Sequence, residues 1–229
     1  MLKSVALCTL FLAAAASAEP ELAFAGKAIF EPDFKSVGTN WMTRVGTWTV
    51  KDGVLTGVER PEQKHGAVCR FPFPFSNALI TFEYRITGGR MASLSVNDAK
   101  DHMARLTLTP TSVQARKDDN DHAGPDVAVP FNIVSNIDGK AWQTAEMALV
   151  GDWLWTRVGG KLSFGRDPLF AKAKANFGFT VGGEGVEFRN LKVCEATPNA
   201  EWEGLAEALR AKYPLPPPPA PAKKKAKKE

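Results

Sequence analysis

The feature that most constrains this chain is a series of short segments, between Ile29 and Ala196, in which apolar and polar residues alternate. In the clearest segment, 79–86, every even position is apolar or aromatic, whereas positions 81, 83 and 85 are polar. Because successive side chains of a strand point to opposite faces, such a segment has one core face and one exposed face. The other expected strands are 46–50, 54–58, 92–96, 105–108, 145–150, 154–158, 176–181 and 186–193.

Turn dipeptides separate these segments. Asp52-Gly53 stands between 46–50 and 54–58 and predicts a tight hairpin. The others are Gly88-Gly89, Asp138-Gly139, Gly159-Gly160 and Gly182-Gly183. No stretch between 29 and 196 has a convincing helical period, so the pattern predicts an all-β fold, a sandwich or a barrel, with two packed layers favoured.

The first 18 residues have the three parts of a signal peptide. Lys3 is the positive region, 5–16 is uncharged and apolar, and Ala16-Ser17-Ala18 is a small-x-small cleavage site. The apolar run is shorter than the roughly 20 residues of a membrane-spanning helix, and the residues before Cys8 make a poor lipidation signal. We therefore expect a secreted or periplasmic mature chain without a transmembrane segment.

The C-terminal part has a different pattern. Thr197 is a plausible N-cap with Pro198 at the first helical position, and an apolar stripe follows, so a helix is expected over 197–213. Residues 214–222 are mostly proline, which favours a stiff extended spacer. The expected organisation is a signal peptide (1–18), a sandwich (19–196), a helix (197–213) and a disordered tail rich in proline and lysine (214–229).

The charge is concentrated at the C-terminal end. The formal net charge is +4, to which Lys3 contributes +1 and residues 223–229 contribute +4, so residues 19–222 carry −1. A near-neutral domain is a poor nucleic-acid binder. The lysine-rich end either attracts an anionic surface of the cell envelope or simply keeps the chain soluble.

Two cysteines, Cys69 and Cys194, remain after the expected cleavage. In an oxidising compartment an even pair favours a disulfide. The alternative is two buried thiols on neighbouring strands, and the sequence does not fix their separation.

The two ends of the predicted sandwich carry distinctive segments. The N-terminal part has Phe30-Glu-Pro-Asp-Phe34, Asn40-Trp41 and 46–55, and the C-terminal part has 167–174, 178–181 and 186–193. These segments resemble the 3-keto-disaccharide hydrolase domain, formerly a domain of unknown function. The resemblance implies a concanavalin-like jelly roll similar to that of family-16 glycosidases, and it implies activity on carbohydrate.

One family-16 feature is absent from the sequence. The paired-carboxylate strand Glu-x-Asp-x-x-Glu does not occur, although retaining hydrolysis needs two carboxyl groups about 5 Å apart. On the clearest strand Glu83 stands alone beside Arg85. The resemblance therefore implies a carbohydrate ligand without supplying a catalytic pair.

A sugar-binding groove is expected on the concave sheet, lined by the polar positions of consecutive strands. These positions are Glu83, Arg85, Ser95, Asn97, Arg105 and Thr107, with Lys117 joining from the next strand. If the protein is catalytic, Glu83 and His102 are the general acid and base candidates, and the arginines and Asn97 orient hydroxyl or keto oxygens. The alternative is a solvated sheet face with cross-strand Glu–Arg pairs. His65 is a second loop histidine of interest, and His122 is a weaker candidate.

Tryptophan and aspartate supply two further candidates. Trp153 and Trp155 share one strand face, downstream of Trp142, and either stack on sugar rings or fill the core. The segment 118–126 is rich in oxygen ligands, but it lacks the bidentate glutamate of a calcium loop, so a polar hairpin loop is favoured. No zinc-type spacing occurs, and no cofactor is expected.

Two functions fit these observations. The first is an exported protein that acts on carbohydrate, similar to the 3-keto-disaccharide hydrolases. The second is a non-catalytic carbohydrate-binding or envelope-binding module, which the missing carboxylate pair favours. The sequence has no Gly-x-Ser-x-Gly elbow, P-loop or dinucleotide fingerprint, which excludes catalysis by those routes.

Overall fold

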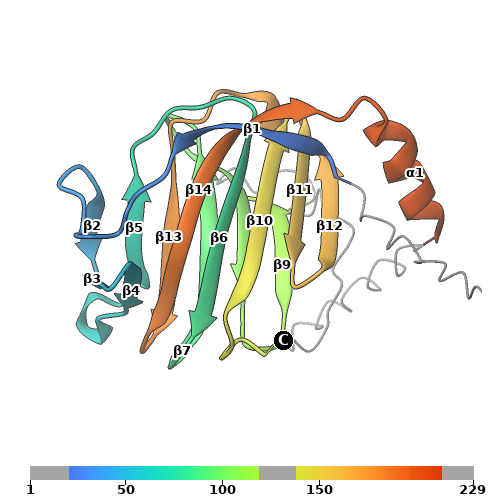
Figure 1. Ribbon diagram of the computed structural model, residues 1–229. Helices are drawn as coiled ribbons and strands as arrows, with labels where there is room; N and C mark the ends of the chain where they lie inside the picture. The colour runs from blue at the N-terminus through green and yellow to red at the C-terminus, as the bar shows by residue number, and fades with distance from the viewer. Residues whose placement is uncertain (1–20, 119–137, 213–229) are drawn as a thin grey trace, which may run out of the picture.

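The computed structural model describes residues 21–118 and 138–212, which form two β-sheets packed face to face (Figure 1). The eight-stranded sheet has the order β12 (Lys161–Arg166), β11 (Trp153–Val158), β10 (Gln143–Val150), β6 (Ala78–Ile86), β14 (Val186–Pro198), β4 (Val54–Val58) and β3 (Thr47–Lys51), and β1 (Ala23–Phe30) also pairs with β14. The six-stranded sheet has the order β2 (Met42–Val45), β5 (Ala67–Phe71), β13 (Asn176–Gly183), β7 (Gly89–Asn97), β8 (His102–Leu108) and β9 (Val113–Lys117). The expected all-β sandwich is confirmed.

The hairpin predicted at Asp52-Gly53 is also confirmed. Strands β3 and β4 pair in register from Thr47↔Val58 to Lys51↔Val54. Asp52 has φ 51° and Gly53 has φ 77°, which is the backbone that a tight two-residue turn requires. Short 3-10 helices, η1 (Pro61–Gln63) and η2 (Pro168–Ala171), lie in two other connections.

The main core lies between the two sheets and is built from the alternate positions predicted to face inward. On β6 these are Ile80, Phe82, Tyr84 and Ile86, all buried. Phe179 of the six-stranded sheet stacks on Phe188 of the eight-stranded sheet, with 3.9 Å between ring centroids. This aromatic contact joins the layers at their centre, and it fixes which face of each strand remains outside.

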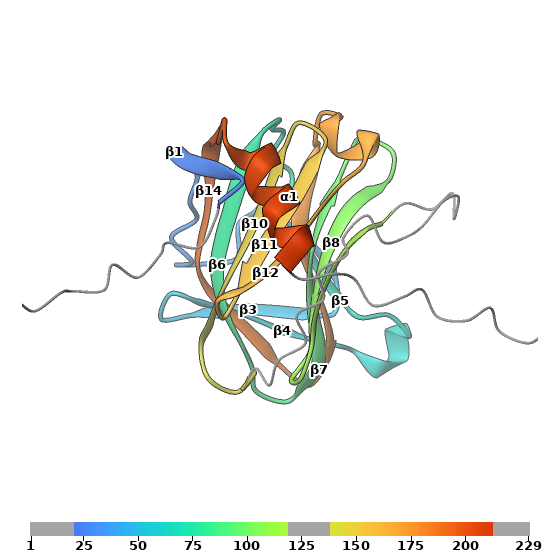
Figure 2. The same cartoon turned by 90° about the vertical axis from the view of Figure 1, so that its right-hand side faces the viewer.

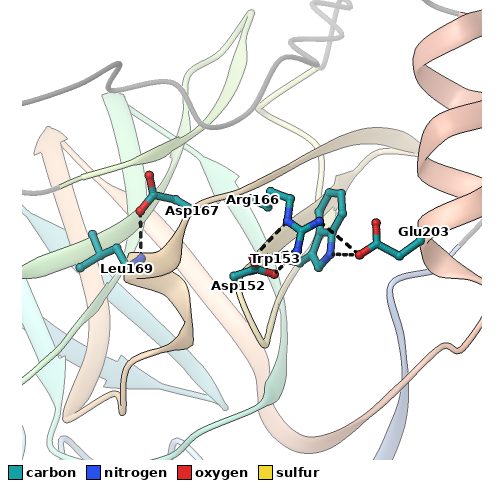
Figure 3. A network of polar contacts seen from close by, with 6 residues as sticks. All are labelled: Asp152, Trp153, Arg166, Asp167, Leu169 and Glu203. Carbon is teal, nitrogen blue, oxygen red and sulfur yellow. Dashed lines mark hydrogen bonds and ion pairs between the residues drawn. The ribbon is translucent and has the colours of Figure 1, made fainter.

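A second apolar cluster covers part of the outer face of the eight-stranded sheet. Helix α1 (Trp202–Lys212) lies against β10, β11 and β12 (Figure 2). Trp202 packs edge-on against Trp153 and Phe164, with centroid distances of 5.8 and 5.2 Å. At the helix start Glu203 accepts hydrogen bonds from Trp153 Nε1 and from Arg166, each at 3.3 Å (Figure 3). Apolar burial and these hydrogen bonds to Glu203 together hold α1 on the sheet.

The predicted beginning of this helix is wrong. Thr197 and Pro198 are the end of strand β14, because the strand continues its pairing with β1 through Phe24↔Thr197 and Ala23↔Pro198. The turn into the helix is made instead by Asn199, whose side-chain oxygen accepts from the backbone N–H of Glu201 at 3.0 Å. No helix in the described ranges 21–118 and 138–212 is long and apolar enough to cross a membrane.

Of the two alternatives for the cysteines, the structure has the free thiols: Cys69 and Cys194 are buried and form no disulfide. Cys69 lies on β5 with its side chain in the core between the sheets. Cys194 follows the inward-facing Val193 on β14, so its side chain points to the outer face of the eight-stranded sheet. A bridge would have to pass through that sheet, which explains why the two thiols stay separate.

Candidate functional site

Polar side chains gather on the outer face of the six-stranded sheet. The alternation that places Leu94, Val96 and Leu106 in the core places their neighbours outside. Strand pairing then aligns one residue from each of six strands in a single row across the sheet. The row is Met42, Arg70, Gly178, Ser95, Arg105 and Arg116. We call Arg70, Arg105 and Arg116 the arginine row.

The middle of this row is a low floor between two long side chains. Gly178 cannot carry a side chain, because a Cβ atom there would collide with the carbonyl oxygen of Cys69 on β5. Ser95 beside it is fully buried, as is Ser93 two residues earlier on the same face, and neither hydroxyl has a hydrogen-bond partner among the described residues. Gly178 and Ser95 thus form a floor of small residues between Arg70 and Arg105.

A pocket of about 320 Å³ adjoins this floor. Arg70, Asn97, His102 and Asn176 line it together with the loop 98–101 and Met42. The strand order explains the gathering, because β5, β13, β7 and β8 are consecutive in the sheet and each contributes a residue. A concave site with a few converging polar groups is the usual form of a small-ligand site.

Asn97 connects the polar groups of this pocket. His102 Nδ1 lies 2.5 Å from Asn97 Oδ1, and Asn97 Nδ2 donates to Asn176 Oδ1 at 2.6 Å. Because an amide oxygen only accepts, His102 carries its hydrogen on Nδ1 and keeps a lone pair on Nε2. Burial lowers the pKa of His102 below 6.5, and Arg105 adds to this effect, whereas Asp118 opposes it. His102 is therefore a neutral base at pH 7.

Among the described residues, Asp118 is the carboxylate that pairs with the arginine row. Asp118 accepts from Arg105 at 2.8 Å and from Arg116 at 3.2 Å. Arg70 makes no ion pair within the described residues, although it is partly buried. Burial lowers the pKa of Arg70, the nearby Arg105 lowers it further, and Asp118 raises it. The face therefore carries excess positive charge at Arg70.

The acidic residues of the pocket loop have structural partners. Asp98 accepts the backbone N–H groups of Lys100 and Asp101, each at 2.7 Å, and these bonds lower its pKa. Asp101 accepts the backbone N–H of His102 at 2.7 Å. Asp98 closes the turn and stays ionised, so it is unsuited to act as a general acid at neutral pH.

The groove expected from the sequence is divided between the two sheets. Glu83 and Arg85 lie on β6 of the eight-stranded sheet, whereas Asn97, His102 and Arg105 lie on the six-stranded sheet. The outer faces of the two sheets point away from each other, so Glu83 and His102 cannot act together on one ligand. The sequence grouping was wrong because it placed consecutive strands in one sheet.

Glu83 and Arg85 belong instead to a ladder of ion pairs. Glu83 accepts from Arg189 at 2.6 Å and from Asn190 at 2.9 Å, and both bonds lower its pKa. Arg85 donates to Glu187 and lies over the ring of Trp142. This arrangement matches the alternative of a solvated face with cross-strand Glu–Arg pairs.

Two other predicted binding residues lie away from the polar face. Lys117 occupies the same face of β9 as the buried Val113 and Ala115, and its amine is 3.9 Å from Asp167. Trp155 is 2 % exposed, in the cluster that α1 covers. Both positions are wrong for a sugar-binding surface, because one side chain points inward and the other is buried.

His65 does not line the pocket. His65 is an exposed loop residue whose Nδ1 is 2.7 Å from the Gly66 carbonyl. His122 and most of the possible calcium loop, including Asp119, Asp121 and Gly124, lie outside the described residues. No group of three or more metal-binding side chains occurs in the part of the chain that the structure describes.

Arg70 and Asn176 were missed by sequence reasoning. Arg70 interrupts an apolar run in 67–71, at the position where alternation predicts an outward side chain. Asn176 begins a predicted strand, where a polar residue attracts no notice. Alternation could have identified Arg70 as outward, but only the strand order brings it beside Asn97 and His102.

Comparison with known proteins identifies the fold. No family model and no curated protein matches the sequence. Among solved structures, carbohydrate-binding module CBM66 from Bacillus subtilis aligns with a TM-score of 0.55 at 18% identity, over 69% of this chain and 96% of that one. A protein of unknown function with a galectin-like fold, also from Bacillus subtilis, aligns with a TM-score of 0.56 at 13% identity, over 77% and 100%.

An enzyme shares the same architecture. The endo-β-1,3-glucanase from Pyrococcus furiosus aligns with a TM-score of 0.58 at 7% identity, over 76% of this chain and 95% of that one. At such identities the likeness concerns the fold alone. The chain is a jelly-roll β-sandwich, and the fold implied by the resemblance in its sequence is confirmed.

Proposed function

We propose that this protein is an exported carbohydrate-binding domain that holds a saccharide on the outer face of its six-stranded sheet. The observation that carries the proposal is the pocket lined by Arg70, Asn97, His102 and Asn176. A sugar presents several hydroxyl groups, each able to donate and accept, and such a lining can satisfy them. Jelly rolls with binding and hydrolytic roles occur among the similar solved structures, which supports a carbohydrate ligand.

Binding is favoured over hydrolysis because the pocket has no free pair of carboxylates within the described residues. Asp98 is held in its turn and Asp101 accepts a backbone N–H, whereas Glu83 lies on the other sheet. Glycosidases of the retaining type need one carboxyl group as nucleophile and another as acid. A binding site needs neither.

A second function is favoured by one observation, the neutral His102. In a 3-keto-glycoside the keto group acidifies the neighbouring C–H bond, so a single base can begin an elimination. The base would take the C2 proton, the C1–C2 double bond would form, and the glycosidic oxygen would leave with a proton from water. His102 has the required lone pair on Nε2 and lines the pocket. Addition of water across the C1–C2 double bond would then complete hydrolysis, the activity that the resemblance to 3-keto-disaccharide hydrolases implies.

Two variants test the proposed face. The full chain is screened on a glycan array, and the affinity for the best ligand is then measured by calorimetry. His102→Ala removes a polar group of the pocket and should weaken binding about threefold to tenfold, the effect of one or two neutral hydrogen bonds. Glu83→Gln is the matched control on the opposite sheet and should leave affinity unchanged.

Each outcome is informative. Loss of binding in Glu83→Gln with normal binding in His102→Ala would place the site on the other sheet and refute the proposal. Turnover of a 3-keto-glycoside by the wild type that disappears in His102→Ala would establish the second function. Thermal unfolding of each variant shows whether a loss reflects misfolding.

Export and the role of the tail rest on the sequence. We include cleavage after Ala18 in the proposal, which N-terminal sequencing of the exported protein tests. Residues 223–229 would add attraction to an anionic envelope surface. Unchanged attachment to envelopes after deletion of 214–229 would remove that role.

A further inference from the structure

The arginine row points to the chemical class of the saccharide. Most partly buried arginines in the described residues have a carboxylate partner: Arg85 pairs with Glu187, Arg157 with Glu146 and Arg189 with Glu83. Within the row, Arg105 and Arg116 share Asp118. Arg70 is the exception, since it lines the pocket and forms no ion pair with a carboxylate of the described residues, Asp98 and Asp101 of the same pocket included.

An unpaired guanidinium in a partly buried site is costly, because it has lost water without gaining a counter-charge. Burial and Arg105 together disfavour its charged form. Two positive side chains facing one floor also repel each other. An anionic ligand would supply the missing counter-charge and reduce the repulsion between the two arginines, so the site favours an anionic ligand over a neutral one.

The surroundings of Arg70 specify a sugar that carries the anion. Arg70 and Arg105 are separated by three strand steps, which corresponds to about 14 Å between their backbone positions. Gly178 and Ser95 form the floor of small residues between them. Asn176 and His102 lie at the pocket edge. Charge recognition is therefore combined with amide and imidazole groups that can recognise sugar hydroxyls.

We propose that the site binds a carboxylate-bearing saccharide, with the planar fork of Arg70 on the carboxylate of a uronic acid. Asn176 and His102 then bind ring hydroxyls. A guanidinium matches a carboxylate with two parallel hydrogen bonds, a geometry that a lysine cannot provide. This inference rests on the proposed function, because it names the ligand class of the same pocket.

The experiment compares one polymer in two charge states. Binding of the full chain to polygalacturonate, to the same polymer with its carboxylates methyl-esterified, and to a sulfated polysaccharide is measured by calorimetry without divalent cations. Polygalacturonate should bind best. Arg70→Gln should weaken that binding about 10- to 100-fold, and Arg70→Lys should recover only part of it, because a point charge replaces the fork.

Arg85→Gln is the matched control, since it removes an arginine of similar burial from the outer face of the other sheet. It also retains residues 223–229, whose lysines can attract any polyanion. Its affinity for polygalacturonate should equal that of the wild type. Binding that is equal in wild type, Arg70→Gln and Arg85→Gln would be non-specific attraction by those lysines and would overturn the inference.

Two other results would also overturn it, and they separate it from the proposed function. Equal binding of the esterified and the free polymer, unaffected by Arg70→Gln, would show that the site binds neutral sugars. The proposed saccharide-binding function would then stand, but the inference of a carboxylate ligand would fail. Tighter binding of the sulfated polymer than of polygalacturonate would show that the site recognises sulfate and not carboxylate. Absence of binding to every glycan on the array would refute both.

Discussion

Replacing Lys174 by methionine should stabilise the protein. Lys174 is 2 % exposed, and its amine donates to the carbonyl oxygen of Phe170 at 2.6 Å. No carboxylate of the described residues pairs with it. Burial therefore lowers the pKa of Lys174 from 10.5 to about 8. Lys174→Met keeps the length and apolar stem of the side chain while it removes the buried charge.

The expected magnitude follows from the two pKa values. Each pKa unit corresponds to about 1.4 kcal/mol, so the change from 10.5 to about 8 costs the folded state about 3 kcal/mol below pH 8. Between pH 8 and 10.5 the unfolded chain binds more protons than the folded one, so this contribution to the unfolding free energy rises with pH. Above pH 10.5 the penalty is gone. Loss of the hydrogen bond to Phe170 costs about 1 kcal/mol, which leaves Lys174→Met about 2 kcal/mol more stable at pH 7.

Urea unfolding of both proteins from pH 7 to pH 10.5 measures the difference. Other groups also titrate there: burial raises the pKa of Cys69 and of Tyr84 to about 12, so their contributions fall as pH rises. Only the variant-minus-wild-type difference isolates Lys174, and the exposed Lys172→Met serves as control. The advantage of Lys174→Met should vanish and reverse by pH 10.5. A variant that is less stable at pH 7, by an amount independent of pH, would refute the reasoning.

Two further substitutions test the site and the helix. Gly178→Ala would force β5 and β13 apart, because the new methyl group meets the Cys69 carbonyl, so it should destabilise the protein by about 1–3 kcal/mol and weaken saccharide binding. Gly204→Ala in α1 places its methyl group in open space and should stabilise the protein by about 1 kcal/mol. Thermal unfolding measures both variants, and equal effects on stability would contradict the close packing at Gly178. Trp202→Ala removes a ring that packs on Trp153 and should lower the free energy of unfolding by about 3–5 kcal/mol, measured by urea unfolding. Protease should also cleave α1 earlier in the variant. Unchanged cleavage would show that α1 does not depend on this contact.

Alternation in the sequence predicted the strands and their core faces well. Ile80 to Ile86 turned out buried at the expected positions, and the Asp52-Gly53 turn joins the strands it was expected to join. These features are local, because they depend on side-chain period and on the backbone that a turn allows. The helix start at Thr197 was wrong because β1, which is more than 160 residues earlier in the chain, extends the last strand.

The candidate site was predicted only in part. Asn97, His102 and Arg105 do lie on one polar face, because they belong to strands joined by a true hairpin, β7 and β8. Arg70 and Asn176 come from strands far apart in the sequence and join them only through the sheet order. Trp155 was a candidate because large aromatics serve both cores and sugar platforms, and the covering helix decides between these uses.

The glycine pairs explain why Glu83 was assigned to the wrong face. Gly88-Gly89 was interpreted as an ordinary turn, but β6 before it belongs to the eight-stranded sheet and β7 after it to the six-stranded sheet. The connection from β13 to β14 crosses between the sheets beside it, and the Gly185 carbonyl accepts the backbone N–H groups of Thr87, Gly88 and Gly89.

Such a corner needs glycine for close approach rather than for a hairpin. A Cβ atom on Gly88 would collide with the Glu184 carbonyl, and Gly183 and Gly185 have φ of 90° and 110°. A Gly-Gly dipeptide can therefore form either a hairpin turn or a crossing between sheets. Only the connection from β13 to β14, nearly a hundred residues later, shows which of the two Gly88-Gly89 forms. Because crossing the sandwich reverses which side faces solvent, the polar positions of β6 and β7 face opposite directions. That crossing leaves His102 to act with Arg70 and Asn176, and it assigns Glu83 to the ion-pair ladder.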